Sequence, residues 1–339
     1  MIPSIDIAAL FGPASAQRDD TDRRIIEAAA GTGFLCVAGL PPAVPHGKAT
    51  RAELLRIFAL PEVEKRKLYR RKFDPARANV YHGWFPLQNG GMTYKEGIDM
   101  GPDAAYPGRP ADPADPLTEA TPLPPEAALP GWRAAVAAYY RGMELTGGMM
   151  MRSVARSLKL PEMFFDPYFA AGISTLRLIR YPVRPPQSFA GLAEDQAFVT
   201  HQGVRRHLIG GAHVDSGFVT LLAQDGVEGL QARATGGAWL DVPPAENGLA
   251  VNFGGLLERW TQGRIKATEH RVIGPGQERM SIPFFYEPRV DALIEKLPLP
   301  GAESFAPFFY GDHLWAAMTK FIEFHGLESL RKPKGRVAA

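Results

Sequence analysis

The second half of the chain divides into short apolar runs that are separated by glycine-rich turns. Seven such runs follow one another, at 175–181, 218–222, 229–233, 239–242, 249–253, 266–273 and 279–286. Glycine and proline supply 66 of the 339 residues, roughly a fifth against about 12% in an ordinary protein. Many short strands joined by tight turns are typical of barrels and sandwiches. We therefore expect a mainly β fold with few, peripheral helices.

The first half mixes helical and extended patterns. Apolar residues recur with helical spacing from 131 to 160, which predicts the longest helix of the chain. The segment 103–129 is crowded with proline and alanine and is expected to be a surface connector. Shorter elements are expected elsewhere: strands at 4–7 and 34–38, and helices at 20–30, 54–58, 61–68 and 314–324.

Charge and cysteine content exclude several classes of protein. The net charge is +2, from 38 basic and 36 acidic residues, which is too close to neutral for a nucleic-acid-binding or membrane-surface protein. No stretch of about 18 apolar residues occurs and the start lacks a signal-peptide pattern, so we expect a cytoplasmic protein. The single cysteine, Cys36, allows no internal disulfide and no cysteine-based metal cage. It lies in an apolar run and is expected to be a buried, inert thiol.

Three residues of the β-rich half form a candidate metal site. His213 and Asp215 are two positions apart, so in an extended segment both side chains point to the same side. His270 follows 55 positions after Asp215, in a β run that a barrel would bring back alongside. Two imidazoles and one carboxylate leave three coordination positions open, which suits non-haem Fe(II) in oxygen-activating enzymes. Each residue taken singly reads as an ordinary turn or strand residue, and only the combination indicates chemistry.

Arg279 and Ser281 form a second candidate group. They alternate onto one side of a run that otherwise holds isoleucine and phenylalanine, so a guanidinium and a hydroxyl would converge inside an apolar barrel. An unpaired charge in such a place is costly, and we expect an anionic partner. The planar guanidinium fork is suited to a carboxylate held at two points.

A family resemblance covers most of the chain and is strongest over residues 211–288. This stretch contains GAHVDSGFVTLLAQD, GLQAR, WLDVPP, GLAVNFGGLLERWTQGRIKATEHRV and RMSIPFFYEP. It resembles the isopenicillin N synthase-like branch of the Fe(II)/2-oxoglutarate-dependent dioxygenase family. The likeness extends more weakly to the N-terminal half, at 5–7, 33–37 and 81–85.

The resemblance implies a double-stranded β-helix (jelly-roll) barrel with Fe(II) held by His213, Asp215 and His270. It also implies a site for the cosubstrate 2-oxoglutarate, formed by Arg279, Ser281, Tyr181 and, as a weaker candidate, Arg177. Such an enzyme would use O₂ to oxidise a small molecule, with hydroxylation as the expected outcome, and release succinate and CO₂. No protein group would be catalytic beyond the metal centre.

The expected organisation is a single domain in four regions. These are an N-terminal α/β region packing on the barrel (1–130), a long helix (131–166), the β-helix catalytic core (167–290) and a C-terminal helix and tail (291–339). We expect a monomer or weak homodimer that binds a small-molecule substrate, without nucleic-acid or membrane partners. The insert 183–207 is long enough for a lid over the site, or for a surface excursion or dimer contact.

Candidate substrate residues lie in the N-terminal half and beside the metal site: Tyr81, Trp84, Phe85, Asn89, Thr93 and Ser216. Two positions depart from relatives that bind arginine. Ser216 stands where those relatives have an aromatic residue, and Gly91 where ethylene-forming ones have an acidic residue. Arginine is therefore not the expected substrate. The family's Asn-x-Gly-Asp reads Asn-Phe-Gly-Gly at 252–255, which predicts altered loop packing with the metal ligands retained.

Two other functions fit the same residues. An oxidase like isopenicillin N synthase takes all its electrons from the substrate, and in it the Arg-x-Ser pair binds the substrate's carboxylate. Arg279 and Ser281 therefore do not separate the two chemistries, whereas stoichiometric succinate release would. A metal-stabilised barrel that binds a carboxylate without turnover is the third possibility. Against it stands the open coordination of the predicted ligand set, because structural metal sites close their shell.

Overall fold

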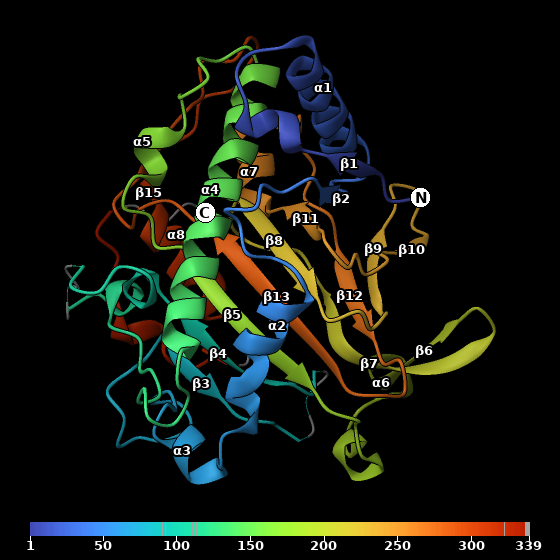
Figure 1. Ribbon diagram of the computed structural model, residues 1–339, viewed down its shortest axis with the longest axis vertical. Helices are drawn as coiled ribbons and strands as arrows, with labels where there is room; N and C mark the ends of the chain where they lie inside the picture. The colour runs from blue at the N-terminus through green and yellow to red at the C-terminus, as the bar shows by residue number, and fades with distance from the viewer. Residues whose placement is uncertain (90, 92, 110–111, 113, 322, 336–339) are drawn as a thin grey trace.

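The computed structural model describes residues 1–89, 91, 93–109, 112, 114–321 and 323–335 (Figure 1). Its strands are β1 Ser4–Asp6, β2 Phe34–Ala38, β3 Gly83–Phe85, β4 Glu96–Met100, β5 Thr175–Tyr181, β6 Phe198–His201, β7 Val204–His213, β8 Val219–Gln224, β9 Leu230–Arg233, β10 Trp239–Asp241, β11 Leu249–Phe253, β12 His270–Ile273, β13 Arg279–Tyr286, β14 Leu293–Ile294 and β15 Phe308–Phe309. Its α-helices are α1 Ala16–Gly31, α2 Lys48–Leu55, α3 Glu62–Arg66, α4 Trp132–Ser157, α5 Asp166–Phe169, α6 Glu194–Ala197, α7 Gly255–Trp260 and α8 Tyr310–Met318. Single 3-10 turns cover Ala8–Phe11, Arg56–Ala59, Pro102–Ala104, Pro116–Thr118, Pro186–Phe189 and Glu328–Leu330.

Two sheets form the barrel. The larger has the strand order β1-β2-β11-β8-β13-β5-β4-β3 and the smaller the order β10-β9-β12-β7-β6, while β14 and β15 pair separately. An apolar cluster that includes Phe34, Cys36, Ile179 and Val272 draws residues from both sheets. The expected mainly β fold, a double-stranded β-helix barrel, is confirmed. Cys36 is buried there, which raises the pKa of its thiol, as expected for an inert residue.

Strand β13 separates two environments by simple alternation. Ile282, Phe284 and Tyr286 belong to the main hydrophobic core outside the barrel. Arg279 and Ser281 lie on the opposite face, because successive side chains of a strand point to opposite sides of the sheet. Both are buried, so this strand is covered on both faces. One strand therefore anchors the helical layer and lines the barrel interior at the same time.

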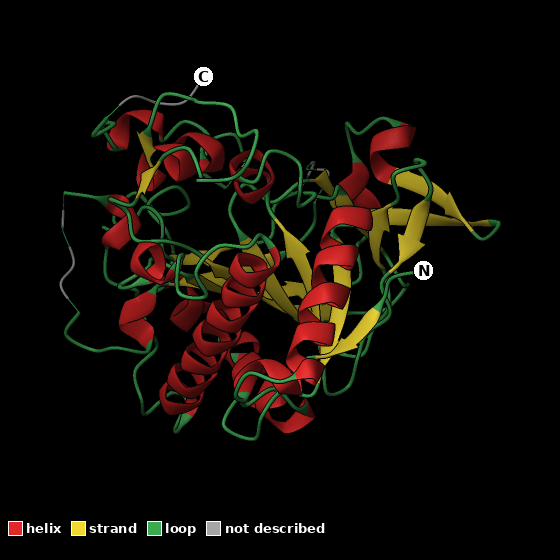
Figure 2. Ribbon diagram, turned by 90° about the horizontal axis from the view of Figure 1, so that it is seen from above, coloured by secondary structure: helices red, strands yellow, loops and turns green. Residues whose placement is uncertain are grey.

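Helix α4 covers the outer face of the larger sheet, and α1 lies beside it (Figures 1 and 2). The ring of Tyr140 meets that of Phe284 edge-on, with centroids 4.9 Å apart. Met150 and Met151 are fully buried in the same layer and fill its core. The predicted helix at 131–160 is confirmed, with ends within three residues of those expected.

The sequence patterns did not reveal strands β3 and β4. Strand β4 carries Glu96 and Asp99, which are buried although acidic residues are rare in strand interiors. Asp99 pairs with Arg70 and Arg177, and Glu96 pairs with Arg180, so arginines from distant parts of the chain neutralise the strand. An apolar pattern cannot indicate a strand whose burial depends on such partners.

The insert 183–207 adds a hairpin to the smaller sheet. Residues 198–207 pair as β6 and the start of β7, and the hairpin projects from the body of the molecule (Figure 1). Strand β12 begins at His270 rather than at the expected residue 266. The residues just before His270 instead lie beside the end of α1, where the Lys266 N–H donates to the Ala29 carbonyl at 2.9 Å. The closing helix is Tyr310–Met318, earlier than the expected 314–324.

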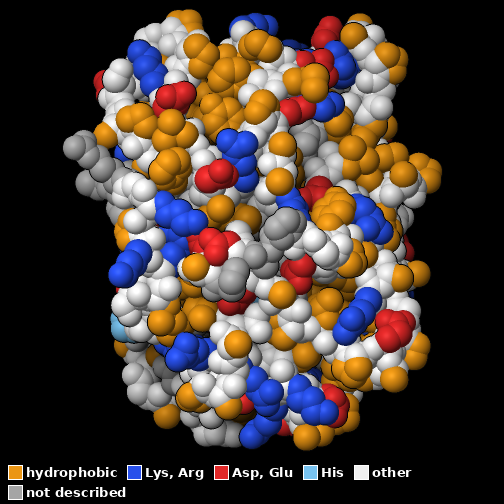
Figure 3. All heavy atoms as spheres, turned by 90° about the vertical axis from the view of Figure 1, so that its left-hand side faces the viewer, with side chains coloured by type: hydrophobic (Ala, Val, Ile, Leu, Met, Phe, Trp, Pro, Cys, Tyr) orange, Lys and Arg blue, Asp and Glu red, His pale blue; other side chains and the backbone are white. Residues whose placement is uncertain are grey.

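No helix in the described ranges is both long and apolar enough to cross a membrane. Basic and acidic side chains are interspersed on the face shown in Figure 3, in keeping with the near-neutral charge.

The two adjacent glycines of α4 should respond in opposite ways to substitution. A Cβ at Gly147 would lie 2.5 Å from Cγ of Tyr286, a ring held in the core, whereas one at Gly148 meets only the Tyr286 hydroxyl at 3.5 Å. We expect Gly147→Ala to lower the free energy of unfolding by about 1–3 kcal/mol. Gly148→Ala should leave it unchanged or raise it by up to about 1 kcal/mol, because alanine favours the helix. Urea denaturation of both variants tests this, and equal effects would contradict the packing described.

Candidate metal centre

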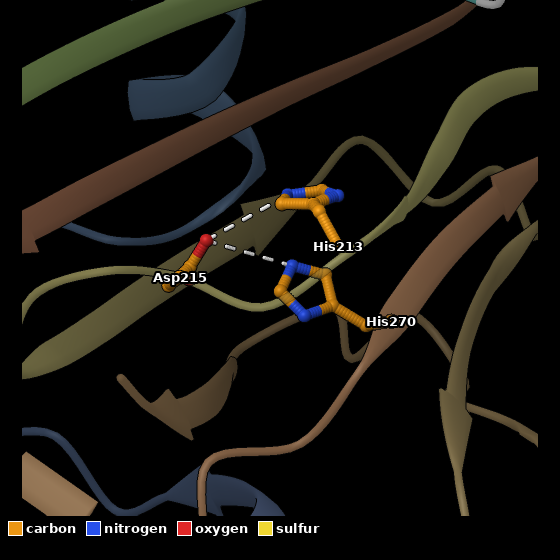
Figure 4. A group of neighbouring side chains, drawn as sticks. All are labelled: His213, Asp215 and His270. Carbon is orange, nitrogen blue, oxygen red and sulfur yellow. Dashed lines mark ion pairs between the residues drawn. The ribbon is translucent and has the colours of Figure 1, made fainter. Parts of the chain in front are cut away.

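The three candidate metal ligands meet at the junction of two adjacent strands. His213 is the last residue of β7 and His270 the first of β12, and the two are direct partners in the antiparallel ladder. Their ring centroids lie 4.3 Å apart. Asp215 follows β7 by two residues and turns its carboxylate towards both rings (Figure 4). One donor atom from each residue lies within 4.8 Å of the other two.

Hydrogen bonds fix which atoms face the centre. His213 Nδ1–H donates to the Gly211 carbonyl at 2.8 Å, and His270 Nδ1–H donates to the Thr268 carbonyl at 3.1 Å. Both Nε2 atoms are left to face Asp215 Oδ1, each at 3.7 Å. These separations are too long for hydrogen bonds but shorter than two metal–ligand bonds of about 2.2 Å each. One ion can therefore reach all three atoms.

The second carboxylate oxygen of Asp215 is held by neighbouring strands. Oδ2 accepts hydrogen bonds from Thr220 Oγ1 at 2.6 Å and from Asn252 Nδ2 at 2.7 Å. Thr220 and Asn252 are themselves direct partners between β8 and β11. The carboxylate is thus oriented with Oδ1 free, as in sites where outer partners position a metal ligand.

Protonation states also suit a metal ion. Burial, reinforced by His270, lowers the pKa of His213 to about 4, so the imidazole is neutral near pH 7. Burial alone would raise the pKa of Asp215, but the two histidines and the hydrogen bonds from Thr220 and Asn252 lower it overall. A neutral imidazole and an ionised carboxylate are the forms that bind metal. Two histidines and one carboxylate match the ligand set of non-haem Fe(II) oxygenases.

A cavity of about 410 Å³ opens on these residues. Arg279, Ser281 and Tyr181 line it as expected from the sequence. The Arg279 side chain is 1% exposed, and its Nη2 donates to Gln224 Oε1 at 3.1 Å. Its Nε and Nη1 have no hydrogen-bond partner in the described part of the chain. Two unpaired guanidinium nitrogens facing a cavity fit a carboxylate ligand.

Arg177 also lines the cavity, but its guanidinium is engaged. Nη2 donates to Asp99 Oδ2 at 2.8 Å, and the group lies between the rings of Phe85 and Phe285 at 5.5 and 5.4 Å. Asp99 bonds Arg70 as well, so one buried carboxylate holds two arginines. The predicted contact of Arg177 with 2-oxoglutarate stays a prediction.

The candidate substrate residues divide into two groups. Tyr81, Thr93 and Ser216 line the cavity. Trp84, Phe85 and Asn89 do not, since the two aromatic rings are buried in packing and Asn89 is exposed. No residue of the insert 183–207, all of which is described, lines the cavity, which favours a surface excursion over a lid. C-terminal residues also line the cavity, among them Met318, Phe321 and Phe324.

Several site residues were missed by the sequence reasoning. Gln224, Thr220 and Asn252 act through strand pairing, which a single sequence does not reveal. Glu287 could have been found, because it continues the odd-numbered alternation that begins at Arg279. Its side chain is buried beside the cavity, and its Oε2 has no hydrogen-bond partner among the described residues. Burial raises the pKa of Glu287 to about 8, with Asp215 and Asp99 adding to the effect, while Tyr310 and Arg177 oppose it.

Comparison with known proteins places this site in context. Residues 186–288 match the sequence profile of the 2OG-Fe(II) oxygenase superfamily. Isopenicillin N synthase of Streptomyces clavuligerus is 28% identical, over 96% of this chain and 97% of its own length. The 2-oxoglutarate-Fe(II) type oxidoreductase hxnY of Emericella nidulans is 29% identical, over 87% of this chain and 82% of its own length.

Solved structures share the fold. A full-length Neurospora crassa protein, crystallised with alpha-KG and thymine, has a TM-score of 0.77 at 23% identity and covers 94% of this chain and 97% of its own. The rice dioxygenase for auxin oxidation has a TM-score of 0.68 at 24% identity and covers 94% and 96%. These likenesses confirm the predicted double-stranded β-helix.

Removing the amide that orients Asp215 should weaken metal binding. We expect Asn252→Ala to reduce Fe(II) affinity by about 10–100-fold, because Thr220 alone then holds the carboxylate. Anaerobic equilibrium dialysis measures the affinity. The exposed Asn247, in the turn before β11, provides the control Asn247→Ala. Fe(II) binding by Asn252→Ala that equals the wild type would show that this hydrogen bond does not position the ligand.

Replacing Glu287 should stabilise the metal-free protein in a pH-dependent way. Between about pH 4.5, the ordinary value, and about pH 8, the folded protein keeps a proton on Glu287 that the unfolded chain has lost. Wild-type stability therefore falls with rising pH relative to Glu287→Gln, by roughly 1.4 kcal/mol per pH unit inside this window. Denaturation of both proteins across the window measures the difference, and a difference that stays constant would refute the raised pKa.

Proposed function

Because the chain carries a 2OG-Fe(II) oxygenase domain, we propose that its cavity oxidises a small organic molecule at a C–H bond, with hydroxylation as the outcome. Its enzyme class, an oxidoreductase, and its cofactors Fe(II), 2-oxoglutarate and O₂ are those of that family. His213, Asp215 and His270 would hold the Fe(II). When bound, Fe(II) with 2-oxoglutarate supplies the oxidising chemistry and releases succinate and CO₂.

The buried guanidinium of Arg279 is the main support for this proposal. A guanidinium that is 1% exposed and has two unpaired nitrogens is costly unless a ligand supplies an anion. Burial lowers the pKa of Arg279, but an arginine stays charged at neutral pH. In this proposal the remote carboxylate of 2-oxoglutarate accepts hydrogen bonds from Nε and Nη1. The Ser281 hydroxyl, two residues along the same face, donates to the same carboxylate.

The remaining wall orients the ligands and excludes water. Tyr181 is the direct strand partner of Arg279, and its ring lies 5.5 Å from the guanidinium. Apolar residues such as Phe285 and Phe321 also line the cavity. Exclusion of water protects a reactive site from side reactions. The cavity volume falls in the usual range for small-molecule sites, about 300–1,000 Å³.

The size of the substrate is also part of the proposal. A cavity of about 410 Å³ that must hold 2-oxoglutarate as well leaves room for one small molecule. The Neurospora crassa fold relative was crystallised with thymine, a substrate-sized ligand of this kind.

The test of the cosubstrate site is an anaerobic titration of the Fe(II) protein with 2-oxoglutarate. A chelated 2-oxo acid gives a weak visible charge-transfer band, and we expect this band in the wild type. In Arg279→Ala, the 2-oxoglutarate concentration that gives half of the full band should be about 30-fold higher than in the wild type, or more. The reason is that truncating one partner of a buried charge pair costs at least about 2 kcal/mol. The control is Arg180→Ala, an arginine of β5 that pairs with Glu96 and Glu278 away from the cavity.

Two outcomes would count against the proposal. A wild-type protein that binds Fe(II) but shows no band would point to the oxidase that needs no cosubstrate. A band unaffected by Arg279→Ala would place the cosubstrate carboxylate elsewhere. Release of one succinate for each O₂ consumed, measured in the presence of 2-oxoglutarate, separates the dioxygenase from both the oxidase and a binding protein without turnover.

A further inference from the structure

The cavity-facing side of β13 begins with the guanidinium of Arg279 and, just beyond the strand, ends with the carboxyl group of Glu287, and each keeps atoms without a partner among the described residues. Arg279, Ser281, Pro283 and Phe285 line the cavity in alternation, and Glu287 is the next residue in the series. The Glu287 backbone N–H donates to Ser174 Oγ at 3.1 Å. This hydrogen bond fixes the backbone position from which the Glu287 side chain extends. Arg279 and Glu287 are eight positions apart, so they occupy opposite ends of this series.

The carboxyl group of Glu287 is built into the cavity wall. The residue is 5% exposed, and its Oε2 has no hydrogen-bond partner within the described ranges. Thr175, on the neighbouring strand β5 and opposite Phe285, is 2% exposed, and its Oγ1 also lacks a partner there. Both residues line the cavity, and a tyrosine hydroxyl lies beside each: Tyr310 beside Glu287 and Tyr81 beside Thr175. Glu287 Oε2 and Thr175 Oγ1 can therefore accept a further hydrogen bond from a ligand in the same space.

Within the described ranges Glu287 forms no ion pair, although the charge of Arg177 acts on it. Arg177 is bound to Asp99, and Lys95 is bound to Glu323 at 3.0 Å. Asp215 belongs to the metal centre, and Tyr310 is neutral because burial raises its pKa. Arg177 and Lys95 are therefore already paired, whereas Lys320, which also lines the cavity, has no ion pair within the described ranges. A buried carboxyl in this state costs folding free energy, which a bound cation would recover.

We propose that Glu287, with Thr175, is a specificity-determining subsite that binds a protonated amine of the prime substrate. The ammonium group supplies the missing positive charge to Glu287, and its N–H bonds satisfy Oε2 and Thr175 Oγ1. An anionic substrate group would be repelled at this end, just as a cation would be repelled by Arg279 at the other. The apolar side chains between the ends, such as Phe285 and Phe321, accept the carbon skeleton. The inference rests on the proposed function and names the substrate class, a small amine.

Two matched probes test the subsite without knowledge of the substrate. Benzylamine and benzyl alcohol have the same size, but only the amine is cationic. We expect the anaerobic protein loaded with Fe(II) and 2-oxoglutarate to bind benzylamine about tenfold or more tightly than benzyl alcohol, measured by calorimetry. Glu287→Gln should abolish this preference, and Thr175→Val should reduce it. The control Glu278→Gln removes a half-exposed acid that pairs with Arg180, and should leave the preference intact.

Proton release gives a second readout that a merely structural residue would not produce. The pKa of Glu287 is raised to about 8 in the free protein, so the group is mostly protonated at pH 7. A cation that ionises it must displace the proton. Calorimetry of benzylamine binding in buffers of different ionisation enthalpy should show close to one proton released by the wild type and none by Glu287→Gln.

The outcomes are decisive in either direction. Equal binding of the two probes, no measurable binding of benzylamine, or a preference that survives in Glu287→Gln would overturn the proposal. If Glu287→Gln does not fold, the Thr175→Val variant and the proton release of the wild type decide. The visible band of bound 2-oxoglutarate, recorded on the same samples, reports on the proposed function alone. A wild-type protein without this band contradicts the proposed function, whereas a wild-type protein with the band but without a preference for the amine contradicts only the amine subsite.

Discussion

The two-sided burial of β13 is the constraint on which the rest of the structure depends. Its even-numbered residues Ile282, Phe284 and Tyr286 belong to the core that includes residues of α4, and its odd-numbered residues line the cavity, which Tyr286 also reaches. A shift of one residue in its pairing would exchange the two sets, placing Arg279 in the helical core and Phe284 in the site. The pairing with β5 and β8 is therefore fixed by both environments. Stability and ligand binding are specified by the same register.

The metal centre depends on the register of two further strand pairs. The ladder places His213 directly opposite His270, and the pairing of β8 with β11 places Thr220 opposite Asn252. The first pair presents two imidazoles, and the second pair fixes the carboxylate between them. None of these groups has to move to face a common point. Such preorganisation by rigid strands is what positions a metal ion accurately.

Buried charges tie the outer parts of the chain to the barrel. Asp99 of β4 holds Arg70 and Arg177, and Lys95 pairs with Glu323 of the C-terminal segment. Each charge is costly to bury alone and becomes tolerable only when its partner arrives. The N-terminal strands, the barrel and the C-terminal segment therefore close around the cavity together. Against this background of paired charges, Arg279 and Glu287 keep polar atoms without a partner in the described part of the chain, which supports the proposal that they bind ligands.

The sequence by itself determined the periodic and local features of this protein. Alternation and turn residues indicated most barrel strands, helical spacing indicated α4, and the spacing of His213, Asp215, His270, Arg279 and Ser281 indicated the site. These features are visible because each depends on neighbours along the chain. Only the tertiary structure decided the burial of β4, the holding of Asp215 by Thr220 and Asn252, and the isolation of Glu287. Each of these depends on partners brought together from distant positions, and whether a charge is paired is a property of the folded arrangement alone.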